Sequence, residues 1–319
     1  MRIVSLLPSA TEILFALGFE KEIVGVSHEC DFPPQARTKK VVIHSRIPKD
    51  AAPAEIDRLV REFVERGESL YSVDTQALDA LQPDLIITQD LCQVCAASPD
   101  DLANALSQMQ RRPEVLCLNP RDLRDVWRDI LWVGEATCRG NEAEALLEKI
   151  GTRLGEIERQ VGCAEDCPRV TILEWLQPFY VAGHWVPEMI EAAGGRDVLG
   201  KKCTPSFRVT AEDVIAAEPE VLLIAPCGYG AQQASDEYRA MMFRVEWNEI
   251  PAVRDGRVYA LDASAYLSRP GPRLVTGIEA LASVLHREIA VSPEAQQAAL
   301  PISSKATSAL PFSSLAASV

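Results

Sequence analysis

Short apolar runs alternate along the chain with segments in which apolar residues recur at helical spacing. In the first 120 residues the runs predict strands at 2–7, 23–26, 83–87 and 115–118, with a shorter strand at 41–43. The helical spacing predicts helices at 10–17, 54–67, 74–81 and 100–109. Such alternation is typical of a parallel sheet with helices on its faces.

The remainder of the chain repeats this pattern after a helical stretch. Helices are predicted at 122–138 and 142–161, and the second is amphipathic and about 20 residues long, which spans roughly 30 Å. A second series follows, with strands at 169–173, 221–225 and 257–261 and helices opening at 187, 211 and 273. We therefore expect an α/β fold of two parallel-sheet lobes joined by a single long helix.

The predicted boundaries divide the chain into four parts. They are an N-terminal α/β lobe at 1–120, a helical connector at 121–167, a C-terminal α/β lobe at 168–290 and a tail at 291–319. From Ser292 onward the chain is rich in Ala, Ser and Pro with few charges, which predicts disorder. At the other end, Ser9 and Glu12 stand in the register of a capping box for the first helix, which Gly18 is expected to stop.

Composition excludes several classes of function. The net charge of −14 argues against binding nucleic acid or an anionic membrane surface, both of which attract Lys and Arg. No apolar stretch reaches the roughly 20 residues of a membrane span. Pro8, Ser9, Thr11 and Glu12 interrupt the apolar N-terminus, so we do not interpret it as a secretion signal and expect a cytoplasmic location.

Two loops of the first lobe carry residues able to bind a ligand or a metal. Each follows a predicted strand, and in open α/β sheets ligands bind at the carboxyl ends of the strands. One loop contains Gln89, Asp90, Cys92 and Cys95, and the other contains His28, Glu29, Cys30 and Asp31. The start of the first helix, with Pro8 and Ser9, adds backbone amides that can face an anion or a carbonyl group.

The cysteines of these loops suggest a metal site. Cys92, Cys95 and Cys30 with His28 form a three-Cys, one-His set of the kind that binds zinc, and iron is a second candidate. The alternative is that these thiols are buried or merely polar, because a CxxC pair alone is a weak signal. A redox pair is a further alternative, although the residues around the motif do not match a thioredoxin-type helix start.

The second lobe offers aromatic residues at corresponding places. Trp175, Trp185 and Tyr229 could form stacking walls for a flat ligand, with a core role as the alternative for Trp175. Further candidates for ligand contact are Cys227, His184 and Arg269. His184 could donate to a ligand or be a surface residue at a helix entry, and Arg269 could bind an anionic group or cap the helix that follows.

Several motifs resemble the periplasmic-type binding proteins for vitamin B12 and ferric siderophores. The matching stretches, in order over roughly residues 1–287, are RIVSLLPSATE at 2–12, VGVS at 24–27, DFPP at 31–34, LQPDLII at 81–87, GG at 194–195, PEV at 219–221 and SRPGP at 268–272. The resemblance implies two α/β lobes that clamp a ligand between them. HECD at 28–31, LCQVC at 91–95 and GHWVPE at 183–188 look like those of a cytosolic branch labelled cobalamin-binding.

The resemblance also bears on a partner. Members of the family dock an ABC importer through an acidic residue on each lobe. Glu212 lies where the acid of the second lobe is expected, whereas Gln76 occupies the corresponding place on the first lobe, which argues against docking.

We therefore expect a soluble ligand-binding protein that clamps cobalamin, a related corrinoid or another metal chelate between two lobes. The alternative is a metal-dependent enzyme on the same scaffold, with a Cys/His metal site and Glu29 or Glu174 as base. A third hypothesis is a transporter-docked binding protein whose export signal is missing from the chain.

Overall fold

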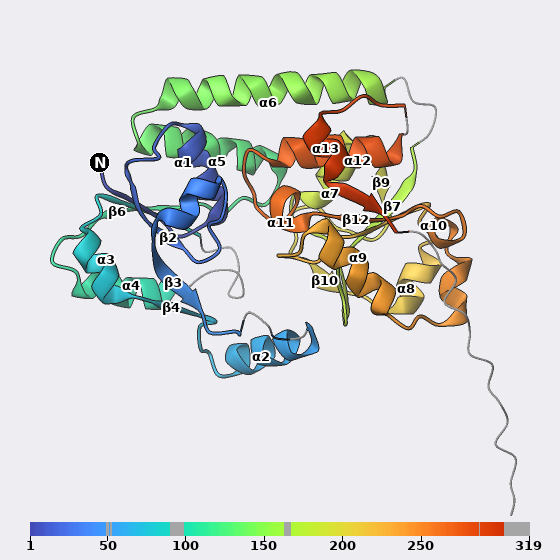
Figure 1. Cartoon of the computed structure of the whole chain (residues 1–319), viewed down its shortest axis with the longest axis horizontal. Coiled ribbons are helices and arrows are strands. Elements are labelled where there is room, and N and C mark those ends of the chain that lie inside the picture. Colours follow the sequence, from blue (N-terminus) through green and yellow to red (C-terminus); the bar gives the residue numbers. More distant parts are fainter. Residues whose placement is uncertain (49–50, 52, 90–98, 163–166, 287, 303–319) are drawn as a thin grey trace, which may run out of the picture.

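The computed structural model describes residues 1–48, 51, 53–89, 99–162, 167–286 and 288–302. Two α/β lobes stand side by side, and the long helix α6 (Gly140–Val161) lies across both of them (Figure 1). This arrangement confirms the predicted two-lobed α/β fold.

The first lobe is built on a six-stranded sheet in the order β4-β3-β2-β1-β5-β6. Its strands are β1 (Ile3–Ser5), β2 (Ile23–Ser27), β3 (Lys40–Ser45), β4 (Tyr71–Val73), β5 (Leu85–Thr88) and β6 (Glu114–Cys117). All pair in parallel except β3 with β4. The helices are α1 (Pro8–Ala16), α2 (Pro53–Glu65), α3 (Thr75–Leu81), α4 (Pro99–Gln108) and α5 (Leu123–Ala136), with the 3₁₀ turn η1 (Pro34–Thr38).

The second lobe is built on a seven-stranded sheet in the order β10-β8-β7-β11-β12-β13, with β9 paired to β7. Its strands are β7 (Arg169–Leu176), β8 (Phe179–Val181), β9 (Arg196–Asp197), β10 (Phe207–Arg208), β11 (Val221–Ile224), β12 (Val258–Leu261) and β13 (Ala299–Pro301). Its helices are α7 (Val186–Ala192), α8 (Ala211–Ala216), α9 (Ala231–Ala240), α10 (Pro251–Arg254), α11 (Ala263–Tyr266), α12 (Leu274–Leu285) and α13 (Pro293–Gln297), with the 3₁₀ turn η2 (Val245–Glu249).

Both sheets are mixed rather than purely parallel as predicted. Their central strands are parallel and buried on both faces, which explains why β5 and β11 are continuous apolar runs in the sequence. The antiparallel strands β4, β8, β10 and β13 are only two or three residues long and lie toward the edges. Runs of this length leave too little pattern to be recognised in the sequence.

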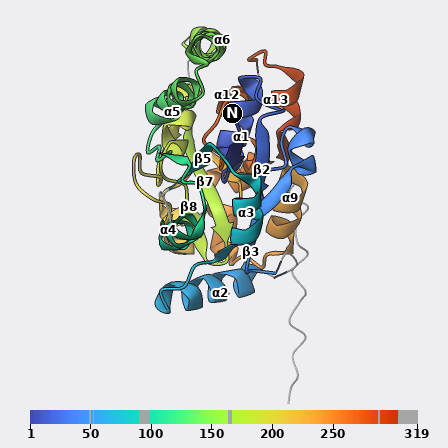
Figure 2. The same cartoon turned by 90° about the vertical axis from the view of Figure 1, so that its left-hand side faces the viewer.

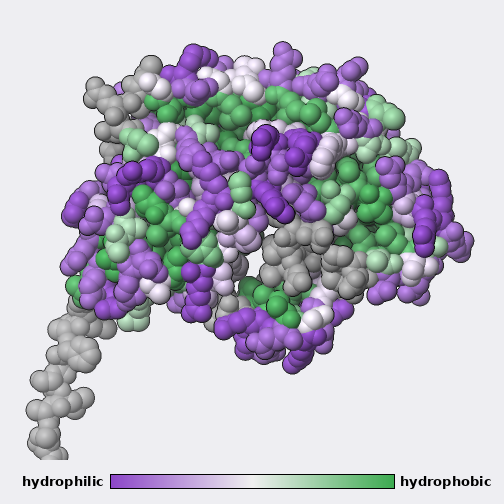
Figure 3. All heavy atoms as spheres, turned by 180° about the vertical axis from the view of Figure 1, so that it is seen from behind, coloured by the Kyte–Doolittle hydropathy of each residue, from purple (hydrophilic) through white to green (hydrophobic). Residues whose placement is uncertain are grey.

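Helix α6 joins the lobes by entering both of their cores. Ile150 packs into the core beneath α1, and Ile157, two turns further along, packs into the core of the second lobe. Helix α2 lies at the opposite end of the first lobe from α6 (Figure 2). Seen from behind, an open space separates α2 from the second lobe on the side away from α6 (Figure 3).

The predicted capping box at the start of the first helix is wrong. Helix α1 begins at Pro8 with Leu7 as its N-cap and has no side-chain cap, because proline favours the first turn and Glu12 is paired elsewhere. Gly18 does stop this helix, with a left-handed φ of +85°.

Part of the expected disordered tail is folded. Helix α13 packs on α12 through the buried small residues Ala280, Ala295 and Ala298, and β13 pairs with β12. The alanine content that suggested disorder instead allows close packing. Among the described helices, none combines the length and apolar character of a membrane span.

Candidate ligand-binding site

Loops that follow strands of the two sheets meet between the lobes. The side chains that interact there are His28, Glu29 and Asp31 of the first lobe and Glu174, Cys227, Ser268 and Arg269 of the second. We call this set the interlobe site. Glu29 and Asp31 of the first lobe therefore contact Arg269 of the second lobe, and His28 joins the site through its contact with Glu29.

Arg269 connects the two sides of the interlobe site. Its Nη1 lies 2.5 Å from Oδ1 of Asp31, and its Nη2 donates to the carbonyl oxygen of Glu29 at 3.1 Å. The side chain of Arg269 is only 10% exposed, whereas that of Asp31 is 39% exposed. Arg269 thus pairs with acceptors of the first lobe, and its contact with an anionic ligand group stays a prediction.

A second ion pair lies beneath the first. The guanidinium of Arg273 donates two hydrogen bonds to the carboxylate of Glu12, at 2.9 and 2.5 Å, and Glu12 is 3% exposed. Arg273 also lies over the ring of Phe32, 4.0 Å from its centroid. These contacts tie the start of α12 in the second lobe to α1 in the first.

The start of α1 is covered by this contact rather than open to a ligand. Ser9 is 4% exposed, and a side chain at Gly271 would lie 3.5 Å from its Cα. The prediction that Pro8 and Ser9 present free amides to an anion is therefore not supported by their surroundings.

The first-lobe side of the site is polar and partly open. His28 Nδ1 lies 3.2 Å from the carbonyl oxygen of Ile43, and Nε2 lies 3.2 Å from a carboxylate oxygen of Glu29. That contact with His28 lowers the pKa of Glu29, whose side chain is 52% exposed. A pocket of about 330 Å³ lies beside these residues, lined by Val26, Ser27, His28, Cys30, Asp31, Ala36, Arg37 and Val41.

The described part of the predicted metal site does not fit a metal. Cys30 is 4% exposed in the first-lobe core, and its sulfur accepts a hydrogen bond from Thr11 Oγ1 at 3.1 Å. Burial raises the pKa of this thiol to about 11, which opposes the thiolate that a metal requires. Asp90, Cys92 and Cys95 lie outside the described residues, and Gln89 is half-buried just before them.

The second-lobe side is centred on Glu174, which sits at a bulge in β7. Leu173 pairs with Val181 and Trp175 with Tyr180, so Glu174 is the extra residue on its strand. Its side chain has a hydrogen-bonding partner in Ser206, and burial raises its pKa to about 7. Glu174 as a whole residue is half-buried.

Two neighbours of Glu174 are fixed by the backbone. The amide of Cys227 donates to the carbonyl oxygen of Glu174 at 3.3 Å. Cys227 as a whole residue is exposed, but desolvation of its thiol raises the pKa of that thiol to about 11. Gly183 holds the segment that carries Ser206, since a Cβ there would meet the carbonyl oxygen of Thr204 at 2.2 Å. Sequence reasoning missed Ser206, because it precedes a two-residue strand without a recognisable pattern.

Trp175 and Tyr229 form an aromatic pair next to Glu174 and Cys227. Their ring centroids are 5.9 Å apart in an edge-to-face arrangement, and both residues are half-buried. The predicted stacking role of Trp185 is wrong, because it is 6% exposed in the core and its Nε1 donates to the carbonyl oxygen of Leu267 at 2.8 Å.

His184 takes part in the second-lobe structure beside Trp185. Its backbone has a left-handed φ of 51°, and its ring stacks on Trp185 at 5.5 Å between centroids. Burial lowers its pKa, and its Nδ1 has no hydrogen-bond partner among the described residues. His184 is therefore held near a neutral form, a half-buried residue at the entry of α7.

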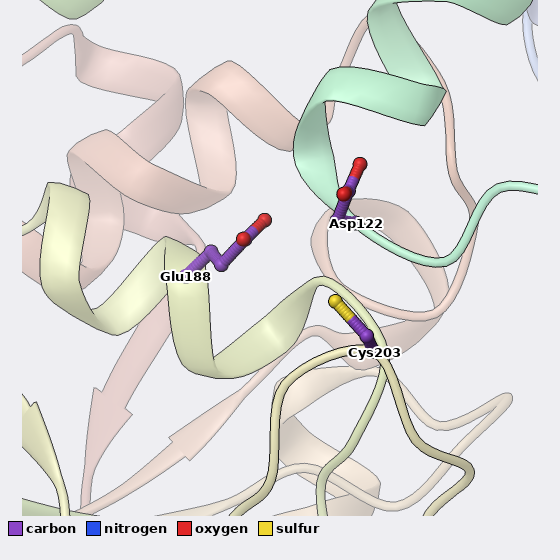
Figure 4. Close-up of side chains that lie close together, drawn as sticks. All are labelled: Asp122, Glu188 and Cys203. Atoms are coloured by element: carbon purple, nitrogen blue, oxygen red, sulfur yellow. The ribbon is translucent and has the colours of Figure 1, made fainter.

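A separate group of possible metal ligands was not predicted from sequence. Asp122, Glu188 and Cys203 lie with their ligand atoms within 4.8 Å of one another (Figure 4). Both acids already accept hydrogen bonds from backbone amides at the start of α5. Asp122 accepts from the amide of Asp125, and Glu188 accepts from the amide of Leu123 at 2.8 Å. The sequence offers Asp122 as a possible N-cap of α5, but its proximity to Glu188 of α7 depends on the tertiary fold.

The chain is similar in sequence to known binding proteins. The sequence model of the periplasmic binding protein family matches residues 3–265. An ABC transporter substrate-binding lipoprotein of Bacillus subtilis, YvrC, is 25% identical over 292 residues, which cover 89% of this chain and 80% of the relative. The vitamin B12-binding protein of Vibrio cholerae is 24% identical over 301 residues, covering 89% and 88%.

Solved structures share the fold. The periplasmic vitamin B12 binding protein BtuF of Vibrio cholerae superimposes with a TM-score of 0.65 at 23% identity, covering 89% of this chain and 96% of that one. A periplasmic heme binding protein from Pseudomonas aeruginosa gives a TM-score of 0.70 at 21% identity, covering 91% and 95%.

These matches correct the cytoplasmic location expected from sequence. The matching family is one of periplasmic binding proteins, and the Bacillus relative is a lipoprotein. The N-terminal residues that interrupt the apolar run form β1 and α1 of the folded lobe, and therefore say nothing about where the protein acts.

Proposed function

Because the chain belongs to the periplasmic binding protein family, we propose that it is an extracytoplasmic protein that holds a corrinoid or another metal chelate between its two lobes. Relatives are named for vitamin B12, and a structural neighbour for heme. Both ligands are large, flat and metal-containing, which favours a metal chelate of this shape as the ligand.

The aromatic pair of Trp175 and Tyr229 supports this function most directly. It offers an apolar, half-buried surface of the kind on which a flat ring system stacks. The polar groups of the interlobe site lie next to it, and a mostly apolar surface with a few placed polar groups is typical of small-molecule sites.

A metal-dependent enzyme on the same scaffold has weaker support. Its metal site needs Cys30 as a thiolate, but this thiol is packed in the first-lobe core. Glu29 and Glu174, the bases considered for it, are better explained as polar residues lining a ligand site.

Delivery to an ABC importer is not included in the proposal. Gln76 and Glu212 are both exposed and both occupy the second position of a helix, α3 and α8 respectively. The two lobes thus present matched positions, but only the second carries an acid, and Glu212 is paired with Arg244 at 2.5 Å.

Titration of the full chain with cyanocobalamin and with haemin, followed by quenching of tryptophan fluorescence, tests this function. We expect saturable binding of at least one chelate, weakened about tenfold by Tyr229→Ala through loss of an aromatic contact of about 1.4 kcal/mol. Trp132→Ala is the matched control, because this exposed residue lies on α5 beneath Arg128. Absence of binding by both chelates, or equal weakening by the two variants, contradicts the proposal.

A further inference from the structure

Glu174 differs from the other acids of the interlobe site in its partners. Glu29 and Asp31 both face Arg269. Glu174 has no cation near its carboxyl group among the residues that the structure describes, and only burial and Ser206 act on it. Without a cation, a carboxyl group that is partly buried is more stable in its neutral form.

The groups around Glu174 are uncharged as well. Ser206 approaches from the segment before β10, and Cys227 from the loop after β11. Ser268, from the loop after α11, hydrogen-bonds with the Cys227 thiol. This part of the site is therefore a group of neutral O–H and S–H donors beside the aromatic pair.

The bulge in β7 gives Glu174 its position. In a regular strand the residue between Leu173 and Trp175 would pair with β8 and point to one face of the sheet. The extra residue is released from that alternation at the carboxyl end of the strand, where bulges re-aim side chains next to functional sites.

We propose that Glu174 binds the ligand as a neutral carboxylic acid, donating its proton in a hydrogen bond to a carbonyl or carboxylate oxygen at the edge of the chelate. This inference rests on the proposed function and specifies one contact within it. Amide and carboxylate side chains surround corrin and porphyrin rings, so an acceptor oxygen is available when the ring stacks on Tyr229. An ionised Glu174 would instead place an acceptor against an acceptor, with its charge partly buried.

Affinity should therefore fall as Glu174 ionises. Its pKa is about 7, whereas the pKa of Cys227 is about 11 and that of Glu29 is lowered by His28, so neither changes charge near neutral pH. Arg269, which also acts on Cys227, is a guanidinium and stays charged. If only the protonated form binds, the apparent dissociation constant rises about tenfold between about pH 6 and about pH 8.

The test measures that pH dependence for wild type, Glu174→Gln and Glu237→Gln, with cyanocobalamin or haemin as probe. Glutamine is a neutral donor at every pH, so Glu174→Gln should retain binding and lose about nine-tenths of the pH effect. Glu237→Gln is the matched control: this acid lies near Tyr229 and burial raises its pKa, yet it lies outside the donor group. It should keep the wild-type pH dependence.

The possible failures are distinguishable. If wild type binds neither chelate at any pH, the proposed function and this inference both fail. If wild type binds equally well at both pH values, or if Glu174→Gln keeps the wild-type pH dependence, only the role of Glu174 is wrong. Loss of binding in Glu174→Gln, with an unchanged circular dichroism spectrum, also refutes the neutral-donor role.

Discussion

A buried acid on α5 predicts how the stability of the protein depends on pH. Asp129 is 1% exposed, and its Oδ1 has no hydrogen-bond partner among the described residues. Desolvation raises its pKa to about 7, although Arg128 opposes the shift. The unfolded chain releases this proton near pH 3.9. The folded state therefore binds the extra proton between these pH values, and stability is lost as pH rises through about 7.

Asp129→Asn removes this titration while keeping the shape of the side chain. The stability of wild type relative to the variant should fall by about 2.6 kcal/mol between about pH 5 and about pH 8 for a folded pKa of 7, or by about 1.4 kcal/mol for a folded pKa of 6. Urea denaturation of both proteins at several pH values measures this difference. The comparison uses the change of this stability difference with pH, so any cost of burying the amide that does not depend on pH cancels.

The control is Asp255→Asn, which removes an exposed acid paired with Arg254. Burial contributes little there, so the stability of wild type relative to this variant should not fall between about pH 5 and about pH 8. The reasoning about Asp129 is refuted if wild type and Asp129→Asn change in parallel from acidic to alkaline pH. It is also refuted if wild type gains stability relative to the variant as pH rises.

Two further predictions concern the packing that positions the site. Glu12→Gln removes the carboxylate partner of Arg273 at a position that is 3% exposed, and should lower the free energy of unfolding measured in urea by about 3–5 kcal/mol. The exposed-pair variant Asp255→Asn should lower it much less. An equally small effect of both variants contradicts a stabilising role for the buried ion pair. Gly183→Ala places a Cβ 2.2 Å from the carbonyl oxygen of Thr204 and should lower the melting temperature. Gly151→Ala, in open space on α6, should raise the free energy of unfolding by about 1 kcal/mol. The opposite order of stabilities would show that the 204–206 segment can move to accommodate the added Cβ.

Hydrophobic pattern sufficed for the parts of the fold that local sequence determines. The buried central strands β5 and β11 and the amphipathic helix α6 were predicted within a few residues of their ends. The short antiparallel strands were not predicted, because two or three residues carry no periodicity and their pairing depends on neighbours distant in sequence.

Residue type alone could not separate core from site. Trp185 and Trp175 look alike in the sequence, yet one donates to a backbone carbonyl in the core and the other pairs with Tyr229 beside the interlobe site. Cys30 was assigned to a metal because it follows a strand next to His28, but its side chain turns into the core toward Thr11. These distinctions depend on which face of a loop is buried, and loops have no repeating pattern that reveals it.

The contacts between the lobes bear on how a ligand is selected. Helix α6 contributes Ile150 to one core and Ile157 to the other, and the buried pair of Glu12 and Arg273 joins the lobes again at α1 and α12. Swinging the lobes apart would have to break that pair and expose apolar surface along α6. A wide hinge motion is therefore disfavoured, and a largely pre-formed site must distinguish ligands through its loops. The side chains able to do so are the charged ones of the loop that follows β2 and the neutral donors around Glu174.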